Sequence, residues 1–187
     1  MFNTNSIVLE RQEPLRASYR RRPAEAMIVK RATAVSAAGT DALHGIVSPG
    51  DTYGLAWPVG VDRAIGGLHD APNPAELLCA ALAACKDISI RMVADVLGIA
   101  LERLEVKVVG KVDVRGCMAM DRDTSVGFQS LACNVRLAVA QGTDPERLAA
   151  LLAQAERSCI NLATLRAGVP VELAFDVQGS DVARLEA

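Results

Sequence analysis

The sequence has few aromatic residues and almost no net charge, and both features argue against a nucleic-acid-binding protein. Aromatic residues make up 3% of the 187 residues, too few for a surface that stacks the bases of single-stranded nucleic acid. Lysine and arginine (20 residues) nearly balance aspartate and glutamate (22 residues), so no overall positive field would attract a polyanion. We therefore expect no nucleic-acid partner.

No hydrophobic run in the sequence is long enough to cross a membrane. The most apolar stretch, residues 77–85, ends at Lys86, well short of the roughly 20 residues that a spanning helix requires. Glu10 and Arg11 lie where a signal peptide would have its apolar region. Five cysteines are neither the dense nor the even set of a secreted disulfide-rich protein. We expect a cytoplasmic protein with mostly free thiols and no membrane partner.

Motifs for the common cofactors are also missing. The sequence contains no GxGxxG dinucleotide fingerprint and no GxxxxGK[ST] phosphate loop. Its two histidines, His44 and His69, cannot form a three-histidine zinc site or an HExxH helix, and no CxxC pair is present. We therefore expect no metal and no organic cofactor, which leaves the cysteines as candidates for chemistry.

The pattern that is present predicts an α+β domain. The strongest helix signal covers residues 74–97, because Asn73 is a good N-cap, Glu76 completes a capping box and Gly98 favours the left-handed stop. A second helix is expected after Asp144 and would end close to Cys159. Short apolar runs between turn residues predict strands at residues 27–35, 43–48, 52–57, 104–114, 128–139 and 171–177. No βαβ unit repeats, so we expect antiparallel sheets packed around a long central helix and a second helix.

The first part of the chain differs in composition from the rest. Residues 1–24 contain a cluster of arginines and two prolines and show little hydrophobic periodicity. We expect a poorly ordered basic N-terminal arm here, acting as a solvated tail, as a strap over a partner subunit or as a basic contact site. Residues 25–187 are then expected to form a single domain.

Two of the five cysteines have settings that suit chemistry. Cys85 lies in the middle of the predicted long helix among alanines, where small side chains leave room for a ligand. Cys159 lies at the end of the second helix, and the two helices are able to pack together. Cys79 and Cys133 fit buried apolar positions, and Cys117 lies in a loop. On the residues alone, both a reactive Cys85–Cys159 pair and two structural thiols remain open.

The segments around these two cysteines resemble a known family. The segment NPAELL at residues 73–78, followed by AALAAC at residues 80–85, is similar to the NPxELLxAALAAC signature of the OsmC/Ohr superfamily. This family contains osmotically induced protein C and the organic hydroperoxide resistance proteins. The segment ERSC at residues 156–159 and VPVE at residues 169–172 resemble its second cysteine helix and closing strand. The resemblance implies an OsmC-like fold and an intertwined homodimer with active sites at the subunit interface.

The resemblance also implies an enzyme, a thiol-dependent peroxidase that protects against oxidative stress. Cys85 would attack the O–O bond of an organic hydroperoxide, release an alcohol and become a sulfenic acid. Cys159 would then form a disulfide with Cys85, which an external dithiol of the lipoyl-protein type would reduce. No metal, haem or flavin is implied.

One departure from the family pattern keeps an alternative open. Organic hydroperoxide reductases use an arginine from the early strand region and a glutamate before the NP motif, and neither is found at the matching positions. Arg63, Arg166 and His44 are the candidates to activate Cys85 in their place, although each also suits an ordinary structural contact. The alternative is a non-catalytic OsmC-like binding protein that uses the dimer-interface pocket for a small apolar ligand.

Overall fold

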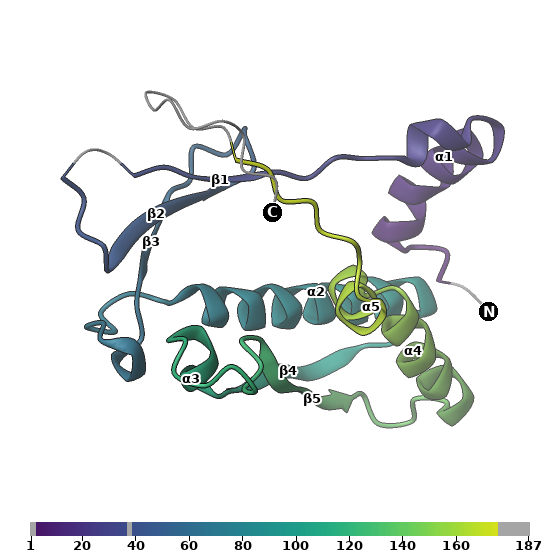
Figure 1. The fold of residues 1–187 in the computed structure, drawn as a ribbon. Helices are drawn as coiled ribbons and strands as arrows, with labels where there is room; N and C mark the ends of the chain where they lie inside the picture. Colours follow the sequence, from purple (N-terminus) through teal and green to yellow (C-terminus); the bar gives the residue numbers. More distant parts are fainter. Residues whose placement is uncertain (1–2, 37–38, 176–187) are drawn as a thin grey trace.

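The computed structural model describes residues 3–36 and 39–175, and a long helix lies at its centre. Helix α2 (Pro74–Leu97) runs between a two-stranded sheet on one side and a three-stranded sheet on the other, as Figure 1 shows. Helices α4 (Pro145–Arg157) and α5 (Ile160–Ala167) pack against α2. None of the helices in these two ranges combines the length and hydrophobicity needed to span a bilayer.

Helix α2 has the bounds that its sequence predicts. The side chain of Asn73 accepts a hydrogen bond from the backbone N–H of Glu76 (2.9 Å), and Glu76 accepts one from the N–H of Asn73 (3.0 Å). Gly98 ends the helix in the left-handed conformation, with φ of 62°. The capping box and the left-handed stop satisfy backbone groups that the helix ends would otherwise leave unpaired.

The two-stranded sheet forms the floor under α2. Strands β4 (Leu101–Val112) and β5 (Phe128–Val139) pair antiparallel, and alternate residues face the helix. The core lies between this sheet, α2 and α4, where Ile90 and Leu151 are almost completely buried. Gly110 lies within β4 and pairs in register with Leu131. A Cβ at position 110 would lie 2.3 Å from the ring of Phe128, so the glycine makes room for that ring.

The three-stranded sheet is the expected antiparallel meander with different strand bounds. Its strands β1 (Ala32–Ala34), β2 (His44–Pro49) and β3 (Trp57–Gly60) follow each other in that order. The third strand was predicted at residues 52–57, but β3 begins at Trp57 and continues through Pro58, which lies opposite Ile46. An edge strand tolerates a proline because only one of its sides needs backbone hydrogen bonds.

Three other segments differ from the expectation. The chain between β4 and β5 contains a short helix, α3 (Val114–Cys117), which is not among the predicted helices. The second helix is followed by α5, which begins directly after Cys159. The predicted last strand is not formed at residues 171–175, since these residues pair with no strand in the described part of the chain, and residues 176–177 lie outside it.

The N-terminal segment is helical, so the prediction of a poorly ordered arm is wrong for residues 7–21. Helix α1 (Ile7–Arg21) is followed by a 3₁₀ turn, η1 (Pro23–Ala26). The Asp95 carboxylate on α2 accepts hydrogen bonds from the Ser6 hydroxyl and from the N–H of Val8 (3.0 Å). The apolar pattern of α1 is weak, and none of its residues is fully buried. Polar contacts to α2 therefore hold the start of this helix. That residues 25–187 form a single domain stays a prediction.

Candidate active site

The sulfurs of Cys85 and Cys159 lie 3.3 Å apart in a single chain. Cys85 projects from the middle of α2, and Cys159 caps the N-terminus of α5. Their positions along the chain differ by 74 residues, so the fold brings them together. The structure therefore unites the two residues that the sequence selected as candidates.

The break between α4 and α5 positions Cys159. Helix α4 stops at Ser158, and Cys159 then adopts an extended conformation (φ −81°, ψ 102°) before α5 begins. The side-chain amide of Asn161 donates a hydrogen bond to the backbone carbonyl of Ala81 on α2 (2.8 Å). Because Ala81 lies one helical turn before Cys85, this bond holds the start of α5 against the part of α2 that carries the first sulfur.

Burial distinguishes the two thiols. Cys159 is completely buried, whereas Cys85 is half-buried. Burial raises the pKa of the Cys159 thiol, and its contact with the Cys85 sulfur acts in the same direction. The backbone N–H of Leu162 and the positive charge of Lys86 oppose this rise in the pKa of Cys159. Cys159 therefore keeps its proton at neutral pH and donates its S–H to the sulfur of Cys85.

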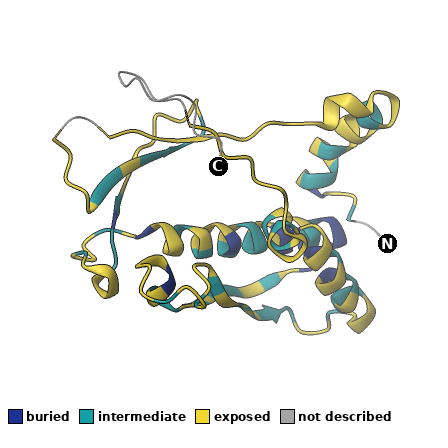
Figure 2. Cartoon of the chain, viewed as in Figure 1, coloured by how far each residue is buried: buried dark blue, intermediate teal, exposed yellow. Residues whose placement is uncertain are grey.

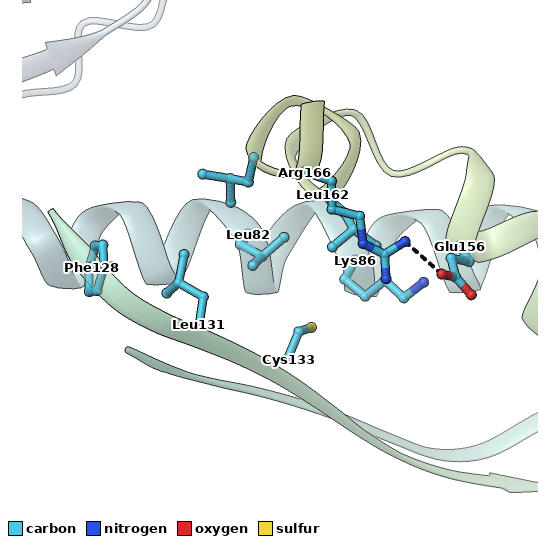
Figure 3. Close-up of a pocket in the computed structure, with 9 residues that line it drawn as sticks. Leu82, Lys86, Phe128, Leu131, Cys133, Glu156, Leu162 and Arg166 are labelled. Atoms are coloured by element: carbon cyan, nitrogen blue, oxygen red, sulfur yellow. Dashed lines mark hydrogen bonds and ion pairs between the residues drawn. The ribbon is translucent and has the colours of Figure 1, made fainter. Parts of the chain in front are cut away.

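A pocket of about 510 Å³ opens between α2, β5 and α5 (Figure 3); Lys86, the residue after Cys85, lines it, whereas the two cysteines of the pair do not. One part of its wall is apolar and is formed mainly by Leu82, Phe128, Leu131 and Leu162. The other part carries charges, where Arg166 and Glu156 form an ion pair of 2.7 Å next to Lys86. The hydrogen bond from Arg166 lowers the pKa of Glu156, so this carboxylate stays ionised at neutral pH. Cys133, predicted as a core residue, also lines the pocket.

Lys86 is a candidate functional residue that sequence reasoning missed. It follows Cys85 directly in the chain, and that adjacency was its only signal. Neighbouring helix residues point about 100° apart, so adjacency does not predict that both side chains serve one site. The structure shows that Lys86 lines the pocket and that its charge acts on Cys159.

The other residues considered for activation of Cys85 make different contacts. Arg166 is bound to Glu156 at the pocket, and Arg63 donates to the carbonyl of Leu68 (3.1 Å). His44 lies between the carboxylates of Asp41 and Asp70. In the described ranges, none of the three forms a hydrogen bond or an ion pair with Cys85 or Cys159. No cluster of three or more histidine, cysteine or acidic side chains within those ranges is suited to hold a metal ion.

Comparison with known proteins supports the fold. The family model described as OsmC-like protein matches residues 67–174, more than half of the 187 residues. A search of curated proteins finds no match.

Three solved structures are similar to this chain. An OsmC-like protein from Mycoplasma pneumoniae has a TM-score of 0.57 and 14% identity, and the match covers 75% of this chain and 89% of that chain. An organic hydroperoxide resistance protein OsmC from Legionella pneumophila has a TM-score of 0.53 and 25% identity, with 75% and 90% covered. An organic hydroperoxide resistance protein from Elizabethkingia anophelis has a TM-score of 0.52 and 22% identity, and the match covers 76% of this chain and 91% of that chain. These matches confirm the predicted OsmC-like α+β fold.

Proposed function

The chain belongs to the OsmC-like protein family, and from this we propose that it is a thiol-dependent peroxidase that reduces organic hydroperoxides through Cys85 and Cys159. The observation that supports this most is the 3.3 Å separation of the two sulfurs. A structurally similar protein at 25% identity is named for organic hydroperoxide resistance, which supports a role in redox stress. The reaction needs reduced thiols at rest, in keeping with the cytoplasmic location that the sequence predicts.

The proposed reaction begins at Cys85. Its thiolate attacks the terminal oxygen of the hydroperoxide, so that an S–O bond forms and the O–O bond breaks. The alkoxide leaves, takes up a proton and becomes an alcohol, while Cys85 becomes a sulfenic acid. We assign the attack to Cys85 because Cys159 is fully buried and its raised pKa keeps it protonated. Lys86, which lines the adjacent pocket, supplies positive charge near the developing anion.

Cys159 completes the cycle in this proposal. Its sulfur attacks the sulfur of Cys85, an S–S bond forms and the sulfenic oxygen leaves as water. An external dithiol then reduces the disulfide and is itself oxidised to a disulfide. In sum, one hydroperoxide and one dithiol give one alcohol, one water and one disulfide. Both protein sulfurs return to the thiol state.

The working form in this proposal is a homodimer. Apolar side chains are exposed over the three-stranded sheet and the C-terminal segment, among them Ile46, Trp57, Val171 and Phe175. Helix α2 also exposes Leu78 and Ile88. Figure 2 shows the described C-terminal segment after α5 in yellow, as exposed. A protein in solution seldom leaves this much large apolar surface uncovered. A second copy of the chain would cover it and close the site from outside.

Peroxide consumption by cysteine variants tests the proposal. Replacement of Cys85 by serine (C85S) is expected to abolish consumption of cumene hydroperoxide, because the attacking sulfur is lost. The C159S variant is expected to stop after one turnover and to hold a sulfenic acid that dimedone traps. C117S is the matched control, because Cys117 is exposed and donates to the carbonyl of Val114, away from the pair, so it should keep full activity. Normal turnover by C85S would refute the proposed function.

The apolar pocket supports a second candidate function, the binding of a small apolar molecule without chemistry. Leu82, Phe128 and Leu131 form much of its wall and would bind such a ligand without any need for the sulfurs. This function predicts saturable binding of a neutral apolar ligand and no loss of hydroperoxide when the reduced protein is mixed with it. Oxidation of Cys85 by one equivalent of hydroperoxide would exclude it as the whole function.

A further inference from the structure

A second pocket, of about 490 Å³, lies between α1, α2 and α4. Its walls combine apolar side chains, among them Met92 and Val96 of α2, with two arginines, Arg16 of α1 and Arg157 of α4. Helix α1 lies outside the residues that match the family model, so one wall of this pocket is not part of the matched region.

The two arginines are not paired with any carboxylate of the residues that the structure describes. Arg16 donates a hydrogen bond to the side-chain oxygen of Gln12 (3.0 Å), a neutral acceptor. Within the part of the chain that the structure describes, neither Arg16 nor Arg157 forms an ion pair with a carboxylate, in contrast to Arg91, Arg115 and Arg166. Two guanidinium groups at the edge of an apolar pocket match a ligand with an anionic head and a hydrocarbon body.

The pocket adjoins the cysteine pair. Ser89 lines it, lies one helical turn after Cys85 and donates its hydroxyl to the Cys85 carbonyl (2.8 Å). Ser158 also lines it and directly precedes Cys159. A ligand in this pocket would therefore lie against the backbone segments that carry both sulfurs.

Helix α1 is fixed in place strongly enough to act as a wall. The Asp95 carboxylate binds the Ser6 hydroxyl and the N–H of Val8, and Asn3 donates to the Asp95 carbonyl (3.1 Å). Ser6 is buried and also caps α1 by accepting from the N–H of Leu9 (3.0 Å). These contacts hold the start of α1 at the end of α2, so the helix extends from there along the pocket that Arg16 lines.

We propose that α1, α2 and α4 form a binding site for a small amphipathic carboxylate, with Arg16 and Arg157 binding the carboxylate and Met92 and Val96 contacting its hydrocarbon part. The site rests on the pocket and its charges, independently of any peroxidase activity.

Calorimetric titration of the reduced full-length protein with octanoate tests the site. Octanoate is expected to bind, and octanamide, which has the same hydrocarbon chain without the charge, is expected to bind more weakly. R16Q and R157Q should each weaken octanoate binding about tenfold, or about 1.4 kcal/mol. R11Q is the matched control, because Arg11 is exposed on the same helix and does not line the pocket. No binding of octanoate, or binding that both pocket variants leave unchanged, would overturn the site.

Discussion

Oxidation of the two active-site thiols should make the protein more stable. The sulfurs lie 3.3 Å apart, and a disulfide bond is about 2.05 Å long, so they need to approach by only about 1.3 Å. Side-chain rotation and small backbone shifts supply a movement of this size. We therefore expect the Cys85–Cys159 disulfide to form without disruption of α2 or α5.

The size of the gain follows from the loop that the bond would close. The two cysteines are separated by 74 positions, and chain-entropy arithmetic for a loop of that length gives about 4.4 kcal/mol of stabilisation. Measured gains are often smaller than this value because the cross-link places some strain on the native state. We expect the oxidised protein to exceed the reduced protein by about 2–4 kcal/mol in free energy of unfolding.

Urea unfolding followed by circular dichroism measures this difference. The protein is oxidised with one equivalent of hydroperoxide, and a second sample is kept in excess reductant. C159S, treated in the same way, is the control and should show no gain, because it lacks the second sulfur. An oxidised protein whose free energy of unfolding equals or falls below that of the reduced protein would refute the argued geometry of the pair.

Three further predictions concern the scaffold. Leu151→Ala should lower the free energy of unfolding by about 3 kcal/mol, because the side chain of Leu151 on α4 is completely buried in the core and its removal leaves a cavity. Chemical denaturation measures this loss, and a loss below about 1 kcal/mol would contradict the prediction. Asn73→Ala should cost about 1 kcal/mol in the same assay through loss of the capping box, with Asn73→Ser as a control that keeps most of the stability. The pKa of His44 is raised, first by its hydrogen bond to Asp70 and then by the one to Asp41. The contribution of the protonated His44 to the free energy of unfolding is therefore complete below its unfolded pKa of about 6.5, and it is lost as the pH rises through the raised pKa. H44Q should therefore be less stable than the natural protein at about pH 5 and equal to it at about pH 9, and a difference that does not change with pH would contradict this.

The long helix and the β4–β5 sheet could be predicted well because their signals are local. The capping residues Asn73 and Glu76 and the stop at Gly98 act within a few residues of each end of α2. The alternation of apolar residues in 128–139 gave the bounds of β5 correctly. The sequence also predicted a helix after Asp144, which caps α4.

The segments that were predicted wrongly depend on distant parts of the chain. The position of Pro58 inside β3 depends on which strand is at the edge of the sheet, and sequence pattern does not contain that information. Helix α1 depends on Asp95, almost 90 residues away from Ser6, because its own residues give a weak apolar pattern. Gly110 shows the same dependence, since the ring of Phe128 from the other strand explains the glycine.

The candidate site could be predicted in part. The resemblance selected Cys85 and Cys159, and the structure brings these two sulfurs into contact. The contact depends on the break at Ser158, which separates α4 from α5 and was predicted only as the end of a helix. The roles of Lys86 and of the α1 pocket could not be predicted, because each depends on how three elements pack together.

Peptide mass spectrometry after one equivalent of cumene hydroperoxide tests the redox role of the cysteine pair most directly. The reduced protein is treated, alkylated to block the remaining thiols and digested. We predict a cross-linked peptide that joins Cys85 to Cys159, while Cys79, Cys117 and Cys133 are recovered alkylated. Recovery of both Cys85 and Cys159 as alkylated thiols, with the hydroperoxide unconsumed, would contradict the proposed chemistry.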